Sequence, residues 1–153
     1  MRGSMDNVTL REYQSDDLDA MYALDVECFE PTFRFSHRAM RGFAEARGAI
    51  SVLAESEGEL VGFCVVQMED QVGYVVTLDV AAPWRRKGLA RHLMAVMEEK
   101  VRATGGRAMA LHVFTENHPA ISLYEGIGYA HVGVAEEFYG RDCDALVYGK
   151  QLE

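Results

Sequence analysis

Three β-rich runs stand next to one another in this sequence, at residues 49–55, 60–68 and 73–80. Only short breaks, at Glu57-Gly58 and at Glu69-Asp70, separate each run from the next, and breaks of this length are typical of hairpins. The spacing therefore predicts an antiparallel meander of three strands. Whatever fold the chain adopts has to be built around this meander.

A helix and a further strand follow the meander directly. Apolar residues recur at helical spacing over residues 88–104, Gly105-Gly106 ends that pattern, and a strand is predicted at 108–114. A strand–helix–strand arrangement joins neighbouring parallel strands by a right-handed crossover. We therefore expect the strands at 73–80 and 108–114 to lie parallel in an otherwise antiparallel sheet.

The remaining elements are predicted from the same kind of local pattern. In chain order they are a strand at 8–13, a helix with Ser15 as its N-cap, a helix at 36–47, a short helix that opens near Pro119, and strands at 129–134 and 143–152. The predicted fold class is α/β in the α+β sense: a mixed, mostly antiparallel sheet of about seven strands with about four helices on both faces.

The chain shows no repeat, low-complexity tract or linker, so we expect a single domain over residues 5–153. Hydrophobic residues make up 49% of the sequence and charged residues 25%, which is enough apolar material for a core without disulfides or metal. Residues 1–4, ahead of a second methionine at Met5, resemble a cloning remnant and are excluded from the predicted domain.

Charge and cysteine content restrict the partners. The formal net charge is −9, which argues against binding to duplex DNA and fits an amine-bearing partner. Three cysteines without a C-x-x-C pair indicate reduced thiols, so we expect a cytoplasmic protein. No apolar run approaches the roughly 18 residues of a membrane span, and the histidines lack zinc-site spacing. We expect neither a membrane partner nor a bound metal.

A basic turn joins the end of one predicted strand to the start of a helix. It reads Arg85-Arg86-Lys87-Gly88-Leu89-Ala90-Arg91. Backbone N–H groups at a helix start bind anions, and the small residues let phosphate oxygens come close to the main chain. The turn therefore predicts a pyrophosphate site, with a solvated basic turn as the alternative. Neither the Walker nor the Rossmann glycine pattern is present.

Two segments of the chain resemble signatures of the GNAT superfamily of N-acetyltransferases. The pattern Arg85-x-x-Gly88-x-Ala90 resembles that superfamily's acetyl-CoA pyrophosphate loop. A second signature is matched by Asn117, Ala120, Leu123-Tyr124 and Gly128-Tyr129. The resemblance implies the GNAT fold, with a splay between the fourth and fifth strands, and acetyl-CoA as cosubstrate.

Within the superfamily the chain is similar to protein N-terminal acetyltransferases, of the bacterial ribosomal-protein alanine acetyltransferase and NatE catalytic subunit types. The segments that carry this similarity are 74–78, 83–86, 111–113 and 138–148. The bacterial enzymes have a glutamate, proposed as general base, at the position of His112. The NatE type has a histidine there, paired with a tyrosine that corresponds to Tyr74.

The resemblance implies the catalytic roles. His112 is expected to act as general base with Tyr74, and Tyr124 to protonate the leaving thiolate. A base with a pKa near neutrality suits an α-ammonium group, whose own pKa is about 7.7–8.0. Strand alternation over 108–114 places His112 beside the small residue Ala110, on the face opposite the large apolar residues. A core histidine and a tyrosine that only fills space are the alternatives.

The resemblance also implies the cosubstrate-binding residues. Besides the basic turn, main-chain groups of Leu78, Asp79 and Val80 are expected to bind the pantetheine arm as an added strand and to polarise the thioester carbonyl. Asn117 and Tyr124 are expected to lie along the other side of that arm, since seven residues make two helical turns.

The acceptor is expected between two loops. By resemblance, Phe29, Glu30 and Pro31 flank one side of a peptide N-terminus, and Tyr139, next to Phe138, flanks the other and binds its backbone. The apolar residues of the first loop indicate a pocket for a small or apolar first side chain. They fit a hydrophobic core equally well.

The expected activity is transfer of acetyl from acetyl-CoA to the α-amino group of a protein or peptide N-terminus, by direct attack in a ternary complex. A lysine side chain, a polyamine or a small amine metabolite is the alternative acceptor. A non-catalytic acyl-CoA sensor is the alternative from another class. The sequence leaves the oligomeric state open between a monomer and a weak dimer.

Overall fold

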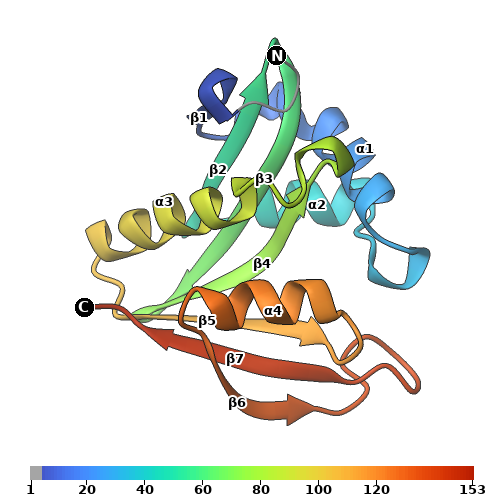
Figure 1. Cartoon of the computed structure of the whole chain (residues 1–153), viewed down its shortest axis with the longest axis vertical. Coiled ribbons are helices and arrows are strands. Elements are labelled where there is room, and N and C mark those ends of the chain that lie inside the picture. The colour runs from blue at the N-terminus through green and yellow to red at the C-terminus, as the bar shows by residue number, and fades with distance from the viewer. Residues whose placement is uncertain (1–4) are drawn as a thin grey trace.

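The computed structural model describes residues 5–153, and its strands form one seven-stranded sheet (Figure 1). The strands are β1 (Thr9–Arg11), β2 (Ala49–Ser56), β3 (Glu59–Glu69), β4 (Val72–Val80), β5 (Ala108–Phe114), β6 (Ala130–Ala135) and β7 (Ala145–Gln151). The α-helices of the described residues are α1 (Leu18–Cys28), α2 (His37–Ala44), α3 (Leu89–Ala103) and α4 (His118–Gly126). The predicted cloning remnant at 1–4 lies outside the described residues.

The sheet is mixed, with the strand order β1-β2-β3-β4-β5-β7-β6. β2, β3 and β4 form the antiparallel meander that their spacing predicts. α3 then carries the chain to β5, which pairs with β4 in parallel, whereas the pairs of β7 with β5 and β6 are antiparallel. The predicted fold class is confirmed, including the single parallel pair.

β4 and β5 pair only over their first halves. The parallel register joins residues 72–75 of β4 to residues 108–111 of β5 and goes no further. At this point the register of β4 against β3 shifts and leaves Val76 as an extra residue. Such a bulge bends its strand. The second halves of β4 and β5 therefore diverge, which is the splay towards the right of Figure 1.

Helices cover both faces of the sheet, as predicted. α3 and α4 lie on one face and α1 and α2 on the other (Figure 1). Cys64 and Val66 of β3 belong to the core under α3, and Phe63 and Val65 of the same strand belong to the core under α1 and α2. All four are fully buried, because a strand covered on both faces has no polar side.

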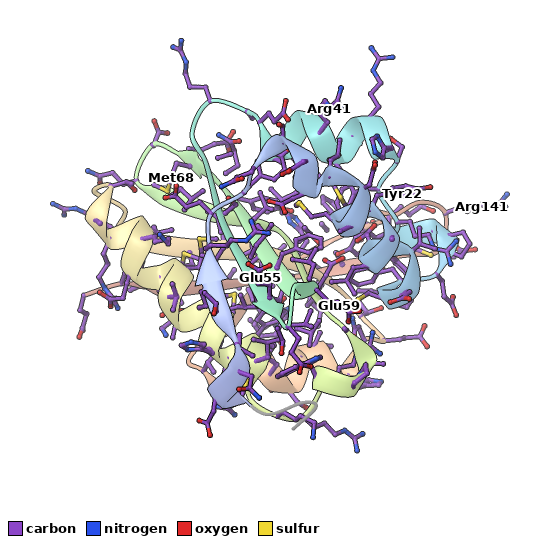
Figure 2. All side chains as sticks on the ribbon, turned by 90° about the horizontal axis from the view of Figure 1, so that it is seen from above. Tyr22, Arg41, Glu55, Glu59, Met68 and Arg141 are labelled. Carbon is purple, nitrogen blue, oxygen red and sulfur yellow. The ribbon has the colours of Figure 1, made fainter. Side chains whose placement is uncertain are left out.

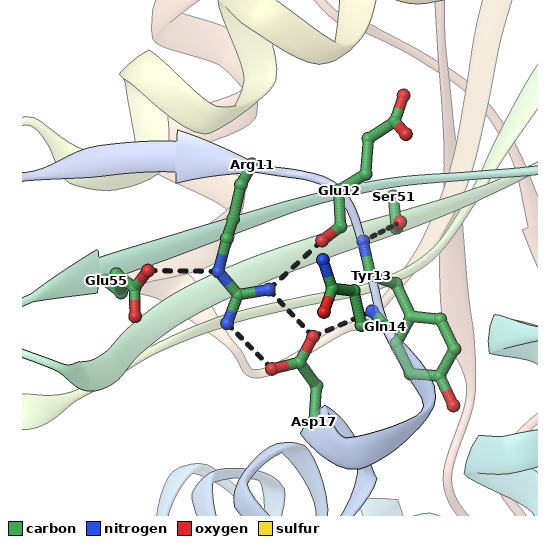
Figure 3. Close-up of polar contacts among 7 residues, drawn as sticks. All are labelled: Arg11, Glu12, Tyr13, Gln14, Asp17, Ser51 and Glu55. Atoms are coloured by element: carbon green, nitrogen blue, oxygen red, sulfur yellow. Dashed lines mark hydrogen bonds and ion pairs between the residues drawn. The ribbon is translucent and has the colours of Figure 1, made fainter.

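The first helix starts differently from the prediction. Ser15 opens a short 3-10 turn ahead of α1 rather than capping the helix. The carboxylate of Asp17 closes this turn by accepting the N–H of Gln14 at 2.8 Å and two N–H groups of Arg11 at 2.7 and 2.8 Å. Arg11 also donates to Glu55 on β2 at 3.0 Å (Figure 3). The Arg11 guanidinium holds the pKa of Asp17 below its usual value.

Several elements are shorter than predicted, and for two of them the structure shows the reason. The strand expected at 8–13 ends before Tyr13, because the backbone N–H of Tyr13 donates to the Ser51 hydroxyl at 3.0 Å instead of to the strand ladder. The helix expected at 36–47 is α2, which ends at Ala44, three residues earlier than predicted. It ends there because the chain must turn to enter β2 through Gly48 at φ +84°.

Candidate active site

A cleft of about 380 Å³ opens where β4 and β5 separate. Its walls come from these two strands, from α4, from the segment that follows α1 and from the loop between β6 and β7. Both loops lie at the open side of the splay in Figure 1. In the view from above, Tyr22 on α1 and Arg141 in the β6–β7 loop also lie on the same side of the molecule (Figure 2).

The structure brings His112 and Tyr74 together inside the splay. The Tyr74 hydroxyl lies 2.8 Å from Nδ1 of His112, although 38 residues separate the two. His112 is half-buried on the face of β5 opposite Leu111 and Val113, as strand alternation predicts. When Nδ1–H donates to Tyr74, Nε2 carries the free lone pair.

Burial keeps both groups of this pair neutral near pH 7. It lowers the pKa of His112 below 6.5 and raises the pKa of Tyr74 above 10.0, because a charged form loses hydration in the cleft. A neutral imidazole with one engaged nitrogen is able to accept a proton at the other. This arrangement would allow a general base to work with an orienting partner.

One side of α4 faces the cleft. Asn117, Ala120 and Tyr124 line it at helical spacing, as predicted for Asn117 and Tyr124. Asn117 is also the N-cap of α4, since its side-chain oxygen accepts the N–H of Ala120 at 3.3 Å. The Tyr124 ring is buried against Tyr129, and this burial raises the pKa of Tyr124, so the phenol keeps its proton.

Aromatic rings build the wall opposite α4. Phe29 and Glu30 line the cleft as expected, but Pro31 does not: it starts a 3-10 turn that brings Phe33 to the wall instead. Phe33 packs on Tyr139 from the β6–β7 loop, with ring centroids 5.0 Å apart. Burial raises the pKa of Tyr139 to about 12. The two loops that the resemblance assigns to the acceptor therefore meet here.

The basic turn lies at the start of α3. Gly88 is the N-cap of the helix and adopts φ +89°, and a Cβ built on it meets nothing within 4 Å. Arg85, Arg86, Lys87 and Arg91 are all exposed, and Arg85 donates from Nε to the carbonyl of Val80 at 3.0 Å. The open space at the start of α3 thus lies in a segment rich in exposed cations.

The predicted main-chain site on β4 is only partly free. Leu78 lines the cleft, and its strand has no partner on the β5 side at this point. The side chain of Asp79 is buried beside Thr77, which donates to it. The carbonyl of Val80 already accepts the Cys28 thiol at 3.4 Å as well as Arg85.

The profile of the acetyltransferase (GNAT) family matches residues 18–129 of this sequence. The chain belongs to the GNAT family. Because this family uses acetyl-CoA, the protein is an acetyl-CoA-dependent N-acetyltransferase, as the resemblance implied. The match begins at α1 and ends just beyond α4, so it includes the basic turn and every cleft wall except the β6–β7 loop.

Relatives of this GNAT acetyltransferase include proteins named for N-terminal acetylation. It is 23% identical to a putative [ribosomal protein bS18]-alanine N-acetyltransferase of Bacillus subtilis, over 90% of this chain and 91% of the relative. It is 26% identical to an N-alpha-acetyltransferase of Saccharolobus solfataricus, over 94% of this chain and 93% of the relative. The fold matches the crystal structure of the ribosomal-protein-S18-alanine N-acetyltransferase from Escherichia coli with a TM-score of 0.86 at 19% identity, covering 95% of this chain and 94% of that one.

The residues of this acetyltransferase fit the diphosphate of acetyl-CoA at the start of α3. A side chain at Gly88 would fill the open space there, and no capping side chain occupies the first N–H groups of the helix. Ala90 is half-buried in the first turn, and Leu89 is fully buried in the core, so of Leu89 only the backbone is available to a ligand. When bound, acetyl-CoA supplies a thioester whose carbonyl carbon is attacked by the acceptor amine.

Sequence reasoning missed some of the cleft wall in this acetyltransferase. Phe35, Thr77 and Phe114 line it but were not assigned a role. Phe114 follows His112 by two residues on the same strand, so strand alternation was a signal that could have found it. Phe35 and Thr77 carried no comparable signal, because one follows an irregular turn and the other follows the bulge at Val76.

Residues 5–153 of the acetyltransferase contain no group of three or more His, Cys, Asp or Glu side chains arranged to hold a metal ion. Among the helices of these residues, none combines the length and the apolar character needed to cross a membrane.

Proposed function

We propose that this acetyltransferase transfers the acetyl group of acetyl-CoA to the α-amino group of a protein or peptide N-terminus. The observation that carries the proposal is the contact of 2.8 Å between Tyr74 and His112, at the point where β4 and β5 separate. The names of the two relatives, one an alanine N-acetyltransferase and one an N-alpha-acetyltransferase, support the same acceptor class.

The base in the cleft suits an α-amine better than a lysine. Acetyl transfer needs a neutral amine, and an α-ammonium group has a pKa of about 7.7–8.0 against about 10.4 for lysine. The pKa of His112 lies below 6.5. Proton transfer to His112 therefore costs much less free energy from an α-ammonium group than from a lysine ammonium group. An imidazole is therefore sufficient for an N-terminus.

In the proposed reaction His112 takes the proton of the acceptor nitrogen at Nε2, directly or through one water. Tyr74 holds the opposite edge of the imidazole through Nδ1. Tyr124 lines the cleft and keeps its phenolic proton, which it donates to the departing sulfur in this reaction. The amine attacks directly, so no side chain has to carry the acetyl group.

The acceptor enters between the two loops on the open side of the splay (Figure 1). Phe29 and Glu30 stand on one side of this entrance and Tyr139 on the other. Phe33 and Phe114, whose ring centroids are 4.9 Å apart, make the adjoining wall apolar. This wall favours an uncharged first side chain in the acceptor.

A peptide panel tests the acceptor class. Peptides with a free N-terminus and no lysine should be acetylated, and the same peptides with a blocked N-terminus should not. Blocked peptides that contain one lysine, together with a polyamine, represent the alternative acceptors. Equal turnover of free and blocked peptides would reject the N-terminal assignment.

A variant of two cleft residues distinguishes an enzyme from a non-catalytic acyl-CoA sensor. The double variant His112→Ala/Tyr124→Phe should still bind coenzyme A through the basic turn but should lose acetyl transfer. Calorimetry measures the binding and thiol release measures the turnover. Unchanged turnover in this variant would mean that neither residue has its proposed role.

A further inference from the structure

Phe138 lies flat against His112 in a contact that the reaction outlined above does not use. The two ring centroids are 3.9 Å apart and the planes are inclined by only 2°. Phe138 stands in the loop between β6 and β7 and remains 46% exposed. A phenylalanine that only filled the core would be buried, so the parallel contact with the imidazole needs another reason.

The loop holds Phe138 in place from both sides. Backbone hydrogen bonds join Tyr139 to the carbonyl of Cys143 at 3.1 Å and Gly140 to the carbonyl of Glu137 at 3.0 Å. The N–H of Glu137 also donates to the Asp144 carboxylate at 2.8 Å. The tip of the hairpin is therefore closed by its own backbone, and it presents the Phe138 ring to the cleft.

The face of an aromatic ring attracts a cation that lies within about 6 Å of its centroid. His112 is uncharged in the resting cleft, because burial lowers its pKa. When His112 takes a proton from the acceptor, the ammonium N–H bond breaks, an Nε2–H bond forms, and one positive charge moves from the acceptor nitrogen to the imidazole. The charge then lies directly under the Phe138 ring.

We propose that Phe138 is a positioning residue that acts through His112, by holding the imidazole flat and stabilising the cation formed when His112 accepts a proton. The proposal rests on the proposed role of His112 as base. The rings are already in contact, but the attraction between the Phe138 ring and a charged imidazole arises only after proton transfer, so it affects kcat rather than the binding of the acceptor.

Other ionisable groups line the same cleft as His112. They are Tyr74 on β4, which contacts His112, Tyr124 on α4, Tyr139 in the β6–β7 loop, Cys28 at the end of α1 and Glu30 just after it. None of them is a cation at neutral pH. All are unchanged in a series of Phe138 variants, so their effects cancel when the pKa of His112 is compared across that series.

The test compares Phe138→Leu with Phe138→Tyr. Leucine covers the imidazole with apolar atoms but has no π face, whereas tyrosine keeps the flat ring. NMR titration of the His112 Cε1–H should show a lower pKa in Phe138→Leu than in the wild type and an unchanged value in Phe138→Tyr. The value of kcat should fall about 2- to 10-fold in Phe138→Leu, with the KM of the acceptor unchanged.

Two controls accompany these variants. Val134→Ala removes an exposed side chain from β6 in the same hairpin and should change neither quantity. The titrations of the other four histidines, His37, His92, His118 and His131, report whether the fold is intact.

The possible results separate clearly. A His112 pKa in Phe138→Leu that equals or exceeds the wild-type value rejects the proposal, since loss of cover alone would let water in and raise it. A lowered pKa with unchanged kcat also rejects it. A failure of the proposed function gives a different result, because the wild-type protein would then acetylate no peptide with a free N-terminus.

Discussion

At the scale of single residues, the proposed reaction depends on the charge state of His112. Burial lowers the pKa of the imidazole, and Tyr74 engages its Nδ1 atom at 2.8 Å. The neutral form is therefore the resting form at pH 7. Below its pKa the imidazole is protonated and has no lone pair for the acceptor proton.

We expect kcat/KM to rise with pH through a midpoint below 6.5 that belongs to His112. His112→Ala should lower kcat/KM by about 10²- to 10⁴-fold and remove this acid limb. Tyr74→Phe should keep the limb but lower the rate, because the imidazole loses its orienting partner. His131→Ala, in an exposed position of β6, serves as control. An acid limb that persists in His112→Ala would assign the base to another residue.

At the scale of elements, β4 is attached to α1 by two buried carboxyl groups. Asp25 of α1 and Asp79 of β4 are 0% and 1% exposed. One oxygen of each has no partner, while the other oxygens accept the N–H of Phe35 at 2.9 Å and the hydroxyl of Thr77. Burial is the main cause that raises the pKa of Asp79 well above its usual value, and the neighbouring Asp25 carboxyl is the second. A proton on Asp79, shared with Asp25, satisfies both remaining oxygens.

This pair links stability to pH. A carboxyl whose pKa is raised in the folded state contributes stability that is fully present below its unfolded pKa of about 3.9 and is lost as pH rises through the folded pKa. Asp79→Asn keeps the acceptor for Thr77 and supplies an N–H donor for Asp25 at every pH. We expect the variant to unfold at higher urea concentration than the wild type at pH 7, by on the order of 1 kcal/mol or more, and to lose this advantage near pH 4.

Urea titrations of both proteins at pH 4 and pH 7 measure the effect. Asp16→Asn replaces an exposed carboxylate and is the matched control. An advantage of Asp79→Asn that is equal at the two pH values would show that Asp79 is not protonated in the fold.

At the scale of the whole molecule, the splay divides the sheet into two halves. A hydrogen-bonded network of Glu98, Tyr129, Lys150 and Ile127, which we call the clamp, joins them. β4 and β5 are paired over only four residues each, so other contacts must hold the halves together. Glu98 of α3 accepts the hydroxyl of Tyr129 at 2.8 Å and the ammonium of Lys150 on β7 at 2.9 Å. Lys150 also donates to the carbonyl of Ile127 at 2.8 Å. This network joins the helix that covers the first half to the strands of the second.

Removing one partner of this clamp should destabilise the protein. Lys150→Met leaves the Glu98 carboxylate, only 8% of whose side chain is exposed, without its cation. We expect the free energy of unfolding to fall by about 2–4 kcal/mol. The double variant Glu98→Gln/Lys150→Met should regain part of this loss, because no uncompensated charge remains buried. Urea unfolding of both single variants and the double variant gives the coupling energy, and strict additivity would contradict the clamp.

Local patterns in the sequence determined the order and type of the elements. The short breaks between β-rich runs predicted the meander, and the period of the apolar residues predicted α3. The alternation of β5 predicted that His112 faces away from Leu111 and Val113, as it does. These predictions succeeded because the period of a helix or strand is a property of neighbouring residues. Element ends were less accurate where side chains from elsewhere decided them, as at Tyr13, whose N–H bonds to Ser51.

Only the tertiary structure decided which distant residues meet. The flat contact of Phe138 with His112, the carboxyl pair of Asp25 and Asp79, and the exclusion of Pro31 from the cleft wall have no local signal. Each depends on a bulge, a turn or the packing of separate elements against the sheet. The sequence by itself therefore determined the fold and the chemical types in the site, because those follow from short-range patterns. The distances that make the site reactive depend on the packing of the whole chain.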